Sequence, residues 1–185
     1  MQAKSEQAGK RATSWLRIED LRSDAAELSP EEFEDRYGSA FLLLSSTGIR
    51  HPMNATSTEV LLLELGDGGG ERTAGVSVRV MPIRASEKTP THLITVGRSA
   101  NSDMAIADIS VSRFHAFFKR NPAGAFLLQD VGSTNGTTVN ESPVYSKDAG
   151  PPTEVKSGDN IRFGQVDATF LEVDALLSYV AKFGD

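Results

Sequence analysis

The residues best suited to chemistry gather in four short polar motifs in the second half of the chain, separated by apolar, strand-like runs. In order, they are Gly97-Arg98-Ser99, Ser112-Arg113-Phe114-His115, Gly132-Ser133-Thr134-Asn135-Gly136-Thr137 and Ser157-Gly158-Asp159-Asn160-Ile161-Arg162-Phe163-Gly164. Arginine side chains and hydroxyl groups donate hydrogen bonds and suit an anionic ligand. A Gly-Arg or Asn-Gly pair is common by chance, so the information lies in the order of the whole set.

The spacing of Ser112 and His115 first suggests nucleophilic catalysis, but the sequence gives this idea little support. A serine and a histidine three residues apart do not form a triad without the matching fold. The chain has no Gly-x-Ser-x-Gly elbow, and it shows no paired acid and base, metal cluster, phosphate-binding loop or cofactor fingerprint. We therefore expect no enzymatic activity, no catalytic residue and no cofactor.

Composition limits the class of partner. A formal net charge of −6 over 185 residues argues against nucleic acid, because binding to a phosphate backbone needs a broad basic face. A small basic spot is still compatible with this charge, and Arg98, Arg113, Lys119 and Arg120 are candidates for it. Such a spot is sufficient for one phosphate group.

The absence of cysteine excludes disulfides, and three scattered histidines make a metal site unexpected. The polar N-terminus, residues 1–11, is unlike a secretory signal. No apolar run approaches the ~20 residues that span a bilayer. The sequence predicts a cytoplasmic protein with no membrane partner.

Helical patterns follow a polar N-terminal tail that we expect to be mobile. Apolar residues recur at helical spacing from Trp15, with Thr13 or Ser14 available as the N-cap. The run Ser29-Pro30-Glu31-Glu32 is typical of a second helix start, because Ser29 can cap the helix and Pro30 suits its first position. Gly38 is a plausible end for this helix.

Two apolar runs, 41–44 and 60–65, are either buried strands or short helices. The glycine-rich turn that follows them marks a loose boundary. From Val76 the pattern changes to short alternating strands separated by turns, which is typical of a β-sandwich. After the last strand, apolar residues return to helical spacing, so residues 174–183 are expected to form an amphipathic helix that packs back on the sandwich.

The four motifs, in this order and with strands between them, resemble the forkhead-associated (FHA) domain, a family that binds phosphothreonine peptides. The resemblance covers roughly the second half of the chain. It implies a mostly β fold: an FHA-type antiparallel β-sandwich with an N-terminal α/β extension and a C-terminal helix. We expect the extension at 1–72 (tail, two short helices, one or two strands), the sandwich at 73–173 and the C-terminal helix at 174–185.

The resemblance also assigns roles to individual residues. It implies that Arg98, Ser112 and Thr134 contact the phosphate, that Arg113 contributes its backbone N–H, and that Asn135 holds the main chain of the ligand. It gives structural support of the site to three further residues, Gly97, His115 and Gly136.

Two departures from the family pattern bear on ligand choice. Ser110 stands where some family members carry a basic residue that selects an acidic residue after the phosphothreonine, so such a preference is not expected here. The connection from Val144 to Thr153 is longer than the usual turn; it either shapes ligand selection or is a tolerated insertion. Thr13 follows Lys10-Arg11, and we consider both an autoinhibitory phosphothreonine and an ordinary helix cap at this position.

The expected function is a phosphothreonine-dependent binding module that acts as an adaptor or regulator in Ser/Thr kinase signalling. Its partner would be a phosphothreonine-containing protein or peptide, namely a Ser/Thr kinase or the substrate of one. The alternative is an FHA-like structural or oligomerising scaffold that does not depend on phosphate. The sequence does not indicate the oligomeric state.

Overall fold

The protein is described by a computed structural model that covers residues 15–45, 78–85 and 92–182. The expected tail with Thr13, the apolar run 60–65, the glycine-rich turn and the boundary between residues 72 and 73 all lie outside these described residues. No helix in the described ranges is long and apolar enough to cross a membrane.

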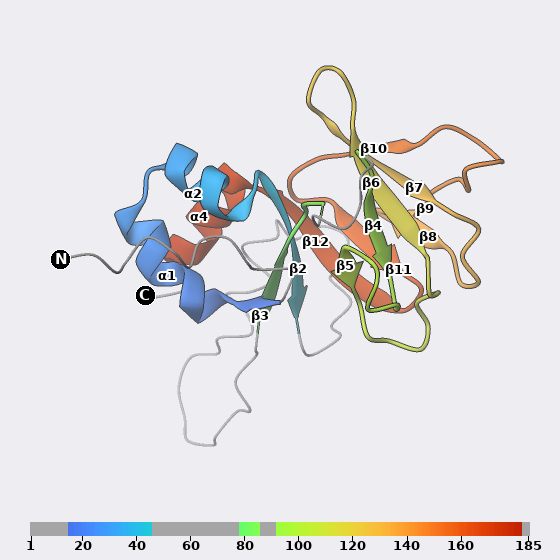
Figure 1. Ribbon diagram of the computed structural model, residues 1–185, viewed down its shortest axis with the longest axis horizontal. Coiled ribbons are helices and arrows are strands. Elements are labelled where there is room, and N and C mark those ends of the chain that lie inside the picture. Colours follow the sequence, from blue (N-terminus) through green and yellow to red (C-terminus); the bar gives the residue numbers. More distant parts are fainter. Residues whose placement is uncertain (1–14, 46–77, 86–91, 183–185) are drawn as a thin grey trace.

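Two β-sheets face each other and form the sandwich (Figure 1). The larger sheet has seven strands in the order β1 (Leu16–Arg17), β3 (Val78–Pro82), β2 (Ala40–Ser45), β12 (Val166–Glu172), β11 (Asn160–Phe163), β8 (Thr137–Val139) and β9 (Ser142–Pro143). The smaller has five strands in the order β10 (Thr153–Val155), β7 (Phe126–Asp130), β6 (Ala116–Arg120), β4 (Ile94–Gly97) and β5 (Met104–Ala105). Neighbouring strands are antiparallel, except that β4 and β5 are parallel. The sequence prediction of a mostly β sandwich is confirmed.

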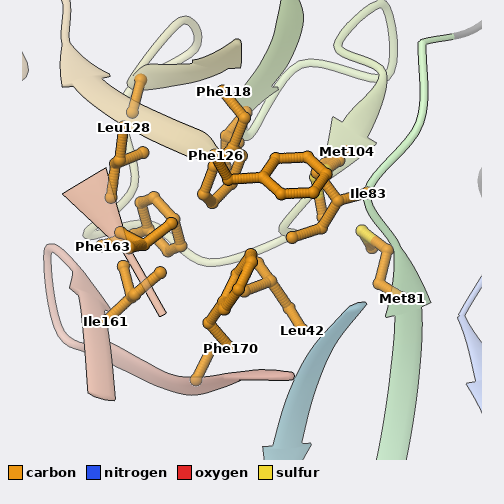
Figure 2. Packing of buried hydrophobic residues seen from close by; sticks show 14 of the residues in the cluster. Leu42, Met81, Ile83, Met104, Phe118, Phe126, Leu128, Ile161, Phe163 and Phe170 are labelled. Atoms are coloured by element: carbon orange, nitrogen blue, oxygen red, sulfur yellow. The ribbon is translucent and has the colours of Figure 1, made fainter. Parts of the chain in front are cut away.

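The first hydrophobic core lies between the two sheets. Aromatic rings from both sheets meet there, with Phe118 in the five-stranded sheet lying 6.4 Å from both Phe163 and Phe170, centroid to centroid. Figure 2 shows these rings with the aliphatic side chains that fill the space around them. Along β6, buried residues alternate with half-buried ones, because successive side chains point to opposite faces and one face of the strand reaches this core.

A second core lies on the other face of the seven-stranded sheet, under a layer of helices. This layer contains α1 (Ile18–Glu27), α2 (Pro30–Tyr37) and α4 (Val173–Lys182), which lie together in Figure 1. The buried side chains between helices and sheet are Ile18, Leu21, Phe33, Phe41, Leu43, Val78, Val80, Leu171, Leu176 and Val180. The C-terminal helix predicted from the sequence is therefore present, and its apolar face is buried.

The helix starts follow local chemistry in one case and tertiary pairing in the other. At α2, Ser29 and Glu32 form the predicted capping box, Pro30 takes the first position and Gly38 ends the helix. The prediction that the first helix begins near Trp15, capped by Thr13 or Ser14, is wrong. This helix begins at Ile18, because Leu16 and Arg17 pair with β3 instead.

The N-terminal segment is tied into both sheets. Strand β2 lies between β3 and β12, near the middle of the larger sheet. Trp15 donates its indole N–H to the carbonyl oxygen of Ala105 at 3.2 Å, and its ring packs against the core between the sheets. Because Ala105 pairs with Gly97 in the smaller sheet, this contact reaches the strand that carries the first polar motif.

The buried face of α4 yields a stability prediction. Leu176→Ala should lower the free energy of unfolding by about 2–5 kcal/mol, because the side chain is fully buried and truncation leaves a cavity. Leu177→Ala on the same helix is the matched control and should cost clearly less, since Leu177 is half-buried. Chemical denaturation followed by tryptophan fluorescence measures both. Equal losses in the two variants would contradict the assigned orientation of α4.

Candidate phosphopeptide-binding site

Arg98 follows β4 directly and is fixed against the loop that carries the second motif. Its backbone N–H donates to the carbonyl oxygen of Ser112 at 2.9 Å, and its Nε donates to the carbonyl oxygen of Val111 at 3.2 Å. The residue is otherwise exposed. Because Nε is the anchored atom, the two Nη groups are the ones that can serve a ligand.

Gly97 allows the close approach of β4 to the second motif. A Cβ atom at this position would lie 2.2 Å from the carbonyl oxygen of Arg113, so any side chain would force the two segments apart. The same carbonyl accepts from the N–H of Ser99 at 3.2 Å. Gly97 therefore sets the distance between the Arg98 loop and the Ser112 loop.

The hydroxyl groups of Ser112 and Thr134 lie next to each other, although 22 residues separate them in the chain. Their oxygens are 3.4 Å apart, and the Thr134 N–H donates to Ser112 Oγ at 3.0 Å. Thr134 is exposed and Ser112 is half-exposed. The second and third motifs thus present two adjacent hydroxyls to solvent, beside the anchored Arg98.

Asn135 is oriented by a contact that the sequence did not reveal. Its Nδ2 donates to the carbonyl oxygen of Ser110 at 2.7 Å. Ser110 is itself buried, and its hydroxyl donates to Asp108 at 2.6 Å and accepts from the N–H of Gln165 at 3.0 Å. Ser110, which stands where some family members carry a basic residue, is thus buried, and its carbonyl oxygen holds Asn135, whose Oδ1 remains suited to accept from a ligand main chain.

His115 connects the second motif to the third. The ring is fully buried; its Nδ1 accepts from the N–H of Ser112 at 2.9 Å, and Nε2 lies 3.0 Å from the carbonyl oxygen of Gly136. Since Nδ1 accepts a backbone N–H, the proton of the neutral ring must be on Nε2, which donates to Gly136. Phe163 packs edge-on against the ring at 5.8 Å between centroids.

Burial lowers the pKa of His115 from its ordinary value of 6.5, because the apolar surroundings disfavour the charged ring. The hydrogen bond to Gly136 and the negative charge of Asp130 oppose this effect without reversing it. A protonated ring would also lose the Ser112 N–H as a partner at Nδ1. The connection between the two motifs therefore depends on a neutral imidazole.

Asp130 organises the third motif, and sequence reasoning missed it. Its Oδ1 accepts from the N–H groups of Gly132 (2.7 Å) and Ser133 (2.8 Å), and its Oδ2 accepts from the hydroxyls of Ser133 (2.7 Å) and Thr137 (2.6 Å). Burial alone would raise the pKa of Asp130, but these four hydrogen bonds outweigh it and lower the pKa below 3.8. The available signal was an aspartate two residues before a glycine, which is typical of an Asx turn.

The fourth motif contacts the backbone just before the second motif and within the third through Gly164. Gly164 has a φ of +63°, and a Cβ there would lie 2.4 Å from the carbonyl oxygen of Ser110. Its N–H donates to the carbonyl oxygen of Gly136 at 3.0 Å. Gly136, with a φ of +78°, is a turn residue between Asn135 and β8. Gly164 therefore allows the fourth motif to approach the Ser110 carbonyl closely, whereas Gly136 is needed for its positive φ and not for space.

The basic spot is smaller than expected. Arg98 and Arg113 are exposed at the motif end of the sandwich. Lys119 and Arg120 lie at the opposite end of β6, where the Arg120 guanidinium packs on the Phe126 ring at 4.5 Å and donates to the Ser39 hydroxyl. In the described part of the chain, no group of three or more acidic or histidine side chains is placed to hold a metal ion.

A comparison with protein-family models identifies the segment that carries the site. Residues 94–164, which carry all four motifs, match the family model of the FHA domain. This segment is an FHA domain. The family resemblance inferred from the motifs is thereby confirmed.

Two curated relatives match a stretch of similar length. One is the "Oxoglutarate dehydrogenase inhibitor" of Corynebacterium diphtheriae, 41% identical over 78 residues, which are 42% of this chain and 50% of that protein. Another is the "Glycogen accumulation regulator GarA" of Mycolicibacterium smegmatis, 40% identical over 77 residues, which are 42% of this chain and 44% of that protein. The chain thus aligns with about half the length of these relatives, and their names are those of an inhibitor and a regulator.

Among solved structures, the FHA domain of a Chlamydia trachomatis protein aligns with a TM-score of 0.44 at 19% identity, over 72% of this chain and 97% of that one.

The buried imidazole predicts a pH dependence. The pKa of His115 is lower in the folded chain than in the unfolded chain, so stability is complete above about pH 6.5 and decreases as the unfolded state takes up a proton below it. The loss should approach at most about 1.4 kcal/mol per pH unit. Urea denaturation between pH 7.5 and 5.0 measures this slope.

His115→Gln serves as the control because it cannot titrate and leaves the exposed His92 in place. The variant should be less stable at every pH but should show a flatter profile over this range. Identical slopes in both proteins would show that His115 is not responsible. The contribution of Asp130 to the free energy of unfolding falls in a different pH range from that of His115. Because the pKa of Asp130 is lowered in the folded chain, its stabilising effect is lost only below about pH 3.8.

Proposed function

We propose that this chain binds phosphothreonine in partner proteins and acts as an adaptor or regulator in Ser/Thr kinase signalling. The observation that carries the proposal is the adjacency of the Ser112 and Thr134 hydroxyls, 3.4 Å apart, beside the anchored guanidinium of Arg98. A phosphate dianion needs a cationic donor together with neutral donors. These groups supply both, from three separate loops.

The donors are held in place before the ligand arrives. Backbone hydrogen bonds link Arg98 to Ser112, the His115 ring links Ser112 to Gly136, and Asn135 is tied to Ser110. Side-chain and loop ordering normally opposes binding, and preorganisation reduces this cost. Arg98, Ser112 and Thr134 are thus preorganised, and we assign the phosphate contacts to these three residues.

Two neighbouring residues, Arg113 and Asn135, would orient the ligand. We propose that the backbone N–H of Arg113 adds to the phosphate contacts and that Asn135 holds the ligand main chain through its amide. Gly97, His115 and Gly136 position these residues and do not touch the ligand. A binding module of this kind needs no catalytic residue and no cofactor, and its setting is the cytoplasm, where Ser/Thr kinases find their substrates.

The names of the relatives suggest how binding is used. An inhibitor of a metabolic enzyme and a regulator of glycogen accumulation are each about 40% identical to part of this chain. We propose by analogy that this chain acts by occupying a partner, which is a phosphorylated kinase or the substrate of one. The relatives' own targets do not identify the partner here.

The proposal predicts loss of binding in Arg98→Ala. Removing a charge-assisted contact to phosphate commonly costs ~2–5 kcal/mol, so the dissociation constant of a phosphothreonine peptide should rise about 30-fold or more. Isothermal titration with a degenerate phosphothreonine library, and with unphosphorylated and phosphoserine versions, measures the effect. Arg84→Ala removes one exposed arginine next to the helical layer, where Arg84 donates to the Arg36 carbonyl, and should leave affinity unchanged.

Three results would separate the hypotheses. Phosphothreonine-dependent binding that disappears in Arg98→Ala supports the proposed function. Partner binding that survives both dephosphorylation and Arg98→Ala supports the phosphate-independent scaffold. A folded protein that binds no phosphopeptide contradicts the proposal directly.

The two hydroxyls predict a second, non-additive effect. Ser112→Ala and Thr134→Val should each weaken binding about tenfold to hundredfold, because a hydrogen bond to a charged group is worth roughly 1.5–3 kcal/mol. Ser112 Oγ also accepts the Thr134 N–H, so Ser112→Ala disturbs both donors. The double variant should lose less than the sum of the single variants. Strict additivity in this cycle would show that the two groups act separately.

A further inference from the structure

Several exposed apolar side chains in the described part of the chain belong to the loops that carry the site. Among the described residues, the large hydrophobic side chains that are exposed are Ile109 (94%), Phe114 (62%), Val131 (41%) and Tyr145 (57%). All four lie in loops of the FHA segment, whereas the helical layer buries its apolar face. A single exposed hydrophobic residue is ordinary. What matters here is where these side chains lie relative to the phosphate donors.

The second and third motifs run side by side along a seam of hydrogen bonds. Val131 N–H donates to the carbonyl oxygen of His115 at 3.1 Å at one end of the seam. Thr134 meets Ser112 in the middle, and Asn135 Nδ2 meets the carbonyl oxygen of Ser110 at the other end. These three contacts show that the two loops run in opposite directions past each other; two of the contacts use a side-chain atom, Ser112 Oγ or Asn135 Nδ2.

Apolar residues therefore border the polar seam. Phe114 and Val131 flank the bonded His115 end, and Ile109 precedes Ser110 at the Asn135 end. Phe114 is two residues from Ser112, and an extended peptide advances about 3.3 Å per residue. A ligand whose phosphate lies at Ser112 and Thr134 thus brings its neighbouring side chains within reach of Phe114 and Val131.

We propose that the ligand is a phosphothreonine segment that carries a large apolar side chain on one side of the phosphothreonine, within about three residues, and that this side chain packs on Phe114 and Val131. The inference rests on the proposed function and adds the character of the ligand sequence to it. Phe114 and Val131 belong to the same two loops as Ser112 and Thr134, and these loops are joined by hydrogen bonds from Val131 to His115 and from Thr134 to Ser112. Contact with it removes apolar area on both partners from water.

The test is an oriented phosphothreonine peptide library, degenerate at three positions on each side, screened against four proteins: the wild type, Phe114→Ala, Phe114→Leu and Ile109→Ala. The wild type should select large apolar residues on one side. Replacing the selected residue by alanine in the best peptide should weaken wild-type binding about tenfold. In Phe114→Ala the same replacement should change affinity by less than about threefold.

The other two variants make the test specific. Phe114→Leu keeps an apolar surface and should retain the selection. Ile109→Ala removes an even more exposed side chain from the opposite end of the seam and should also retain it. Selection that is absent from the wild type, unchanged in Phe114→Ala, or lost in Ile109→Ala would overturn the inference.

A peptide with alanine on both sides of the phosphothreonine separates this inference from the function on which it rests. If that peptide binds the wild type and Phe114→Ala equally, and binds neither when dephosphorylated, the proposed function stands whatever the library shows. If no phosphopeptide binds, the proposed function fails and the apolar selection fails with it.

Discussion

The candidate site depends on one neutral, buried imidazole. His115 accepts a hydrogen bond from the backbone of the second motif and donates one to the backbone of the third, so a single ring fixes the distance between two loops that are far apart in sequence. A replacement that cannot accept at the Nδ1 position leaves the N–H of Ser112 without this partner, which costs about 1–3 kcal/mol, whereas the Gly136 carbonyl still accepts from the N–H of Gly164. The same two loops are joined directly where the Thr134 N–H donates to Ser112 Oγ, so the ring and this bond together place the two hydroxyls side by side.

The surroundings of His115 serve both its neutrality and its geometry. Phe163 supplies an apolar wall, and Asp130 lies close enough for its charge to act on the ring. That charge is compatible with a neutral histidine because four donors already satisfy the carboxylate, two from the backbone and two from hydroxyl groups. His115 thus joins the loops of the second and third motifs, whereas Asp130 fixes the conformation of the third motif alone.

Sequence reasoning succeeded where the determining interactions are local or periodic. The capping box at Ser29 and the helical spacing after residue 173 are both visible within a few residues, and the structure confirms them. It failed at Trp15, where pairing of the next two residues with β3 overrides the helical pattern. The four motifs pointed to the right loops, but contacts such as Asn135 with the Ser110 carbonyl join residues 25 apart and leave no periodic trace.

The segment that matches the FHA family is not sufficient to bury its own core. Residues 94–164 contain Phe118, Phe126 and Phe163, but the opposing Phe170 and Leu42 come from β12 and β2, which lie outside the match. Without those strands the five-stranded sheet would expose the aromatic face that now meets the larger sheet, a large contiguous apolar surface. The same strands carry the helical layer on their other face. Strand β2 is far from the motifs in the sequence, but it pairs with β12 in the larger sheet. It therefore lies across the core from the smaller sheet, whose strand β4 leads into Arg98. The packing beneath the site thus depends on a strand outside the family match.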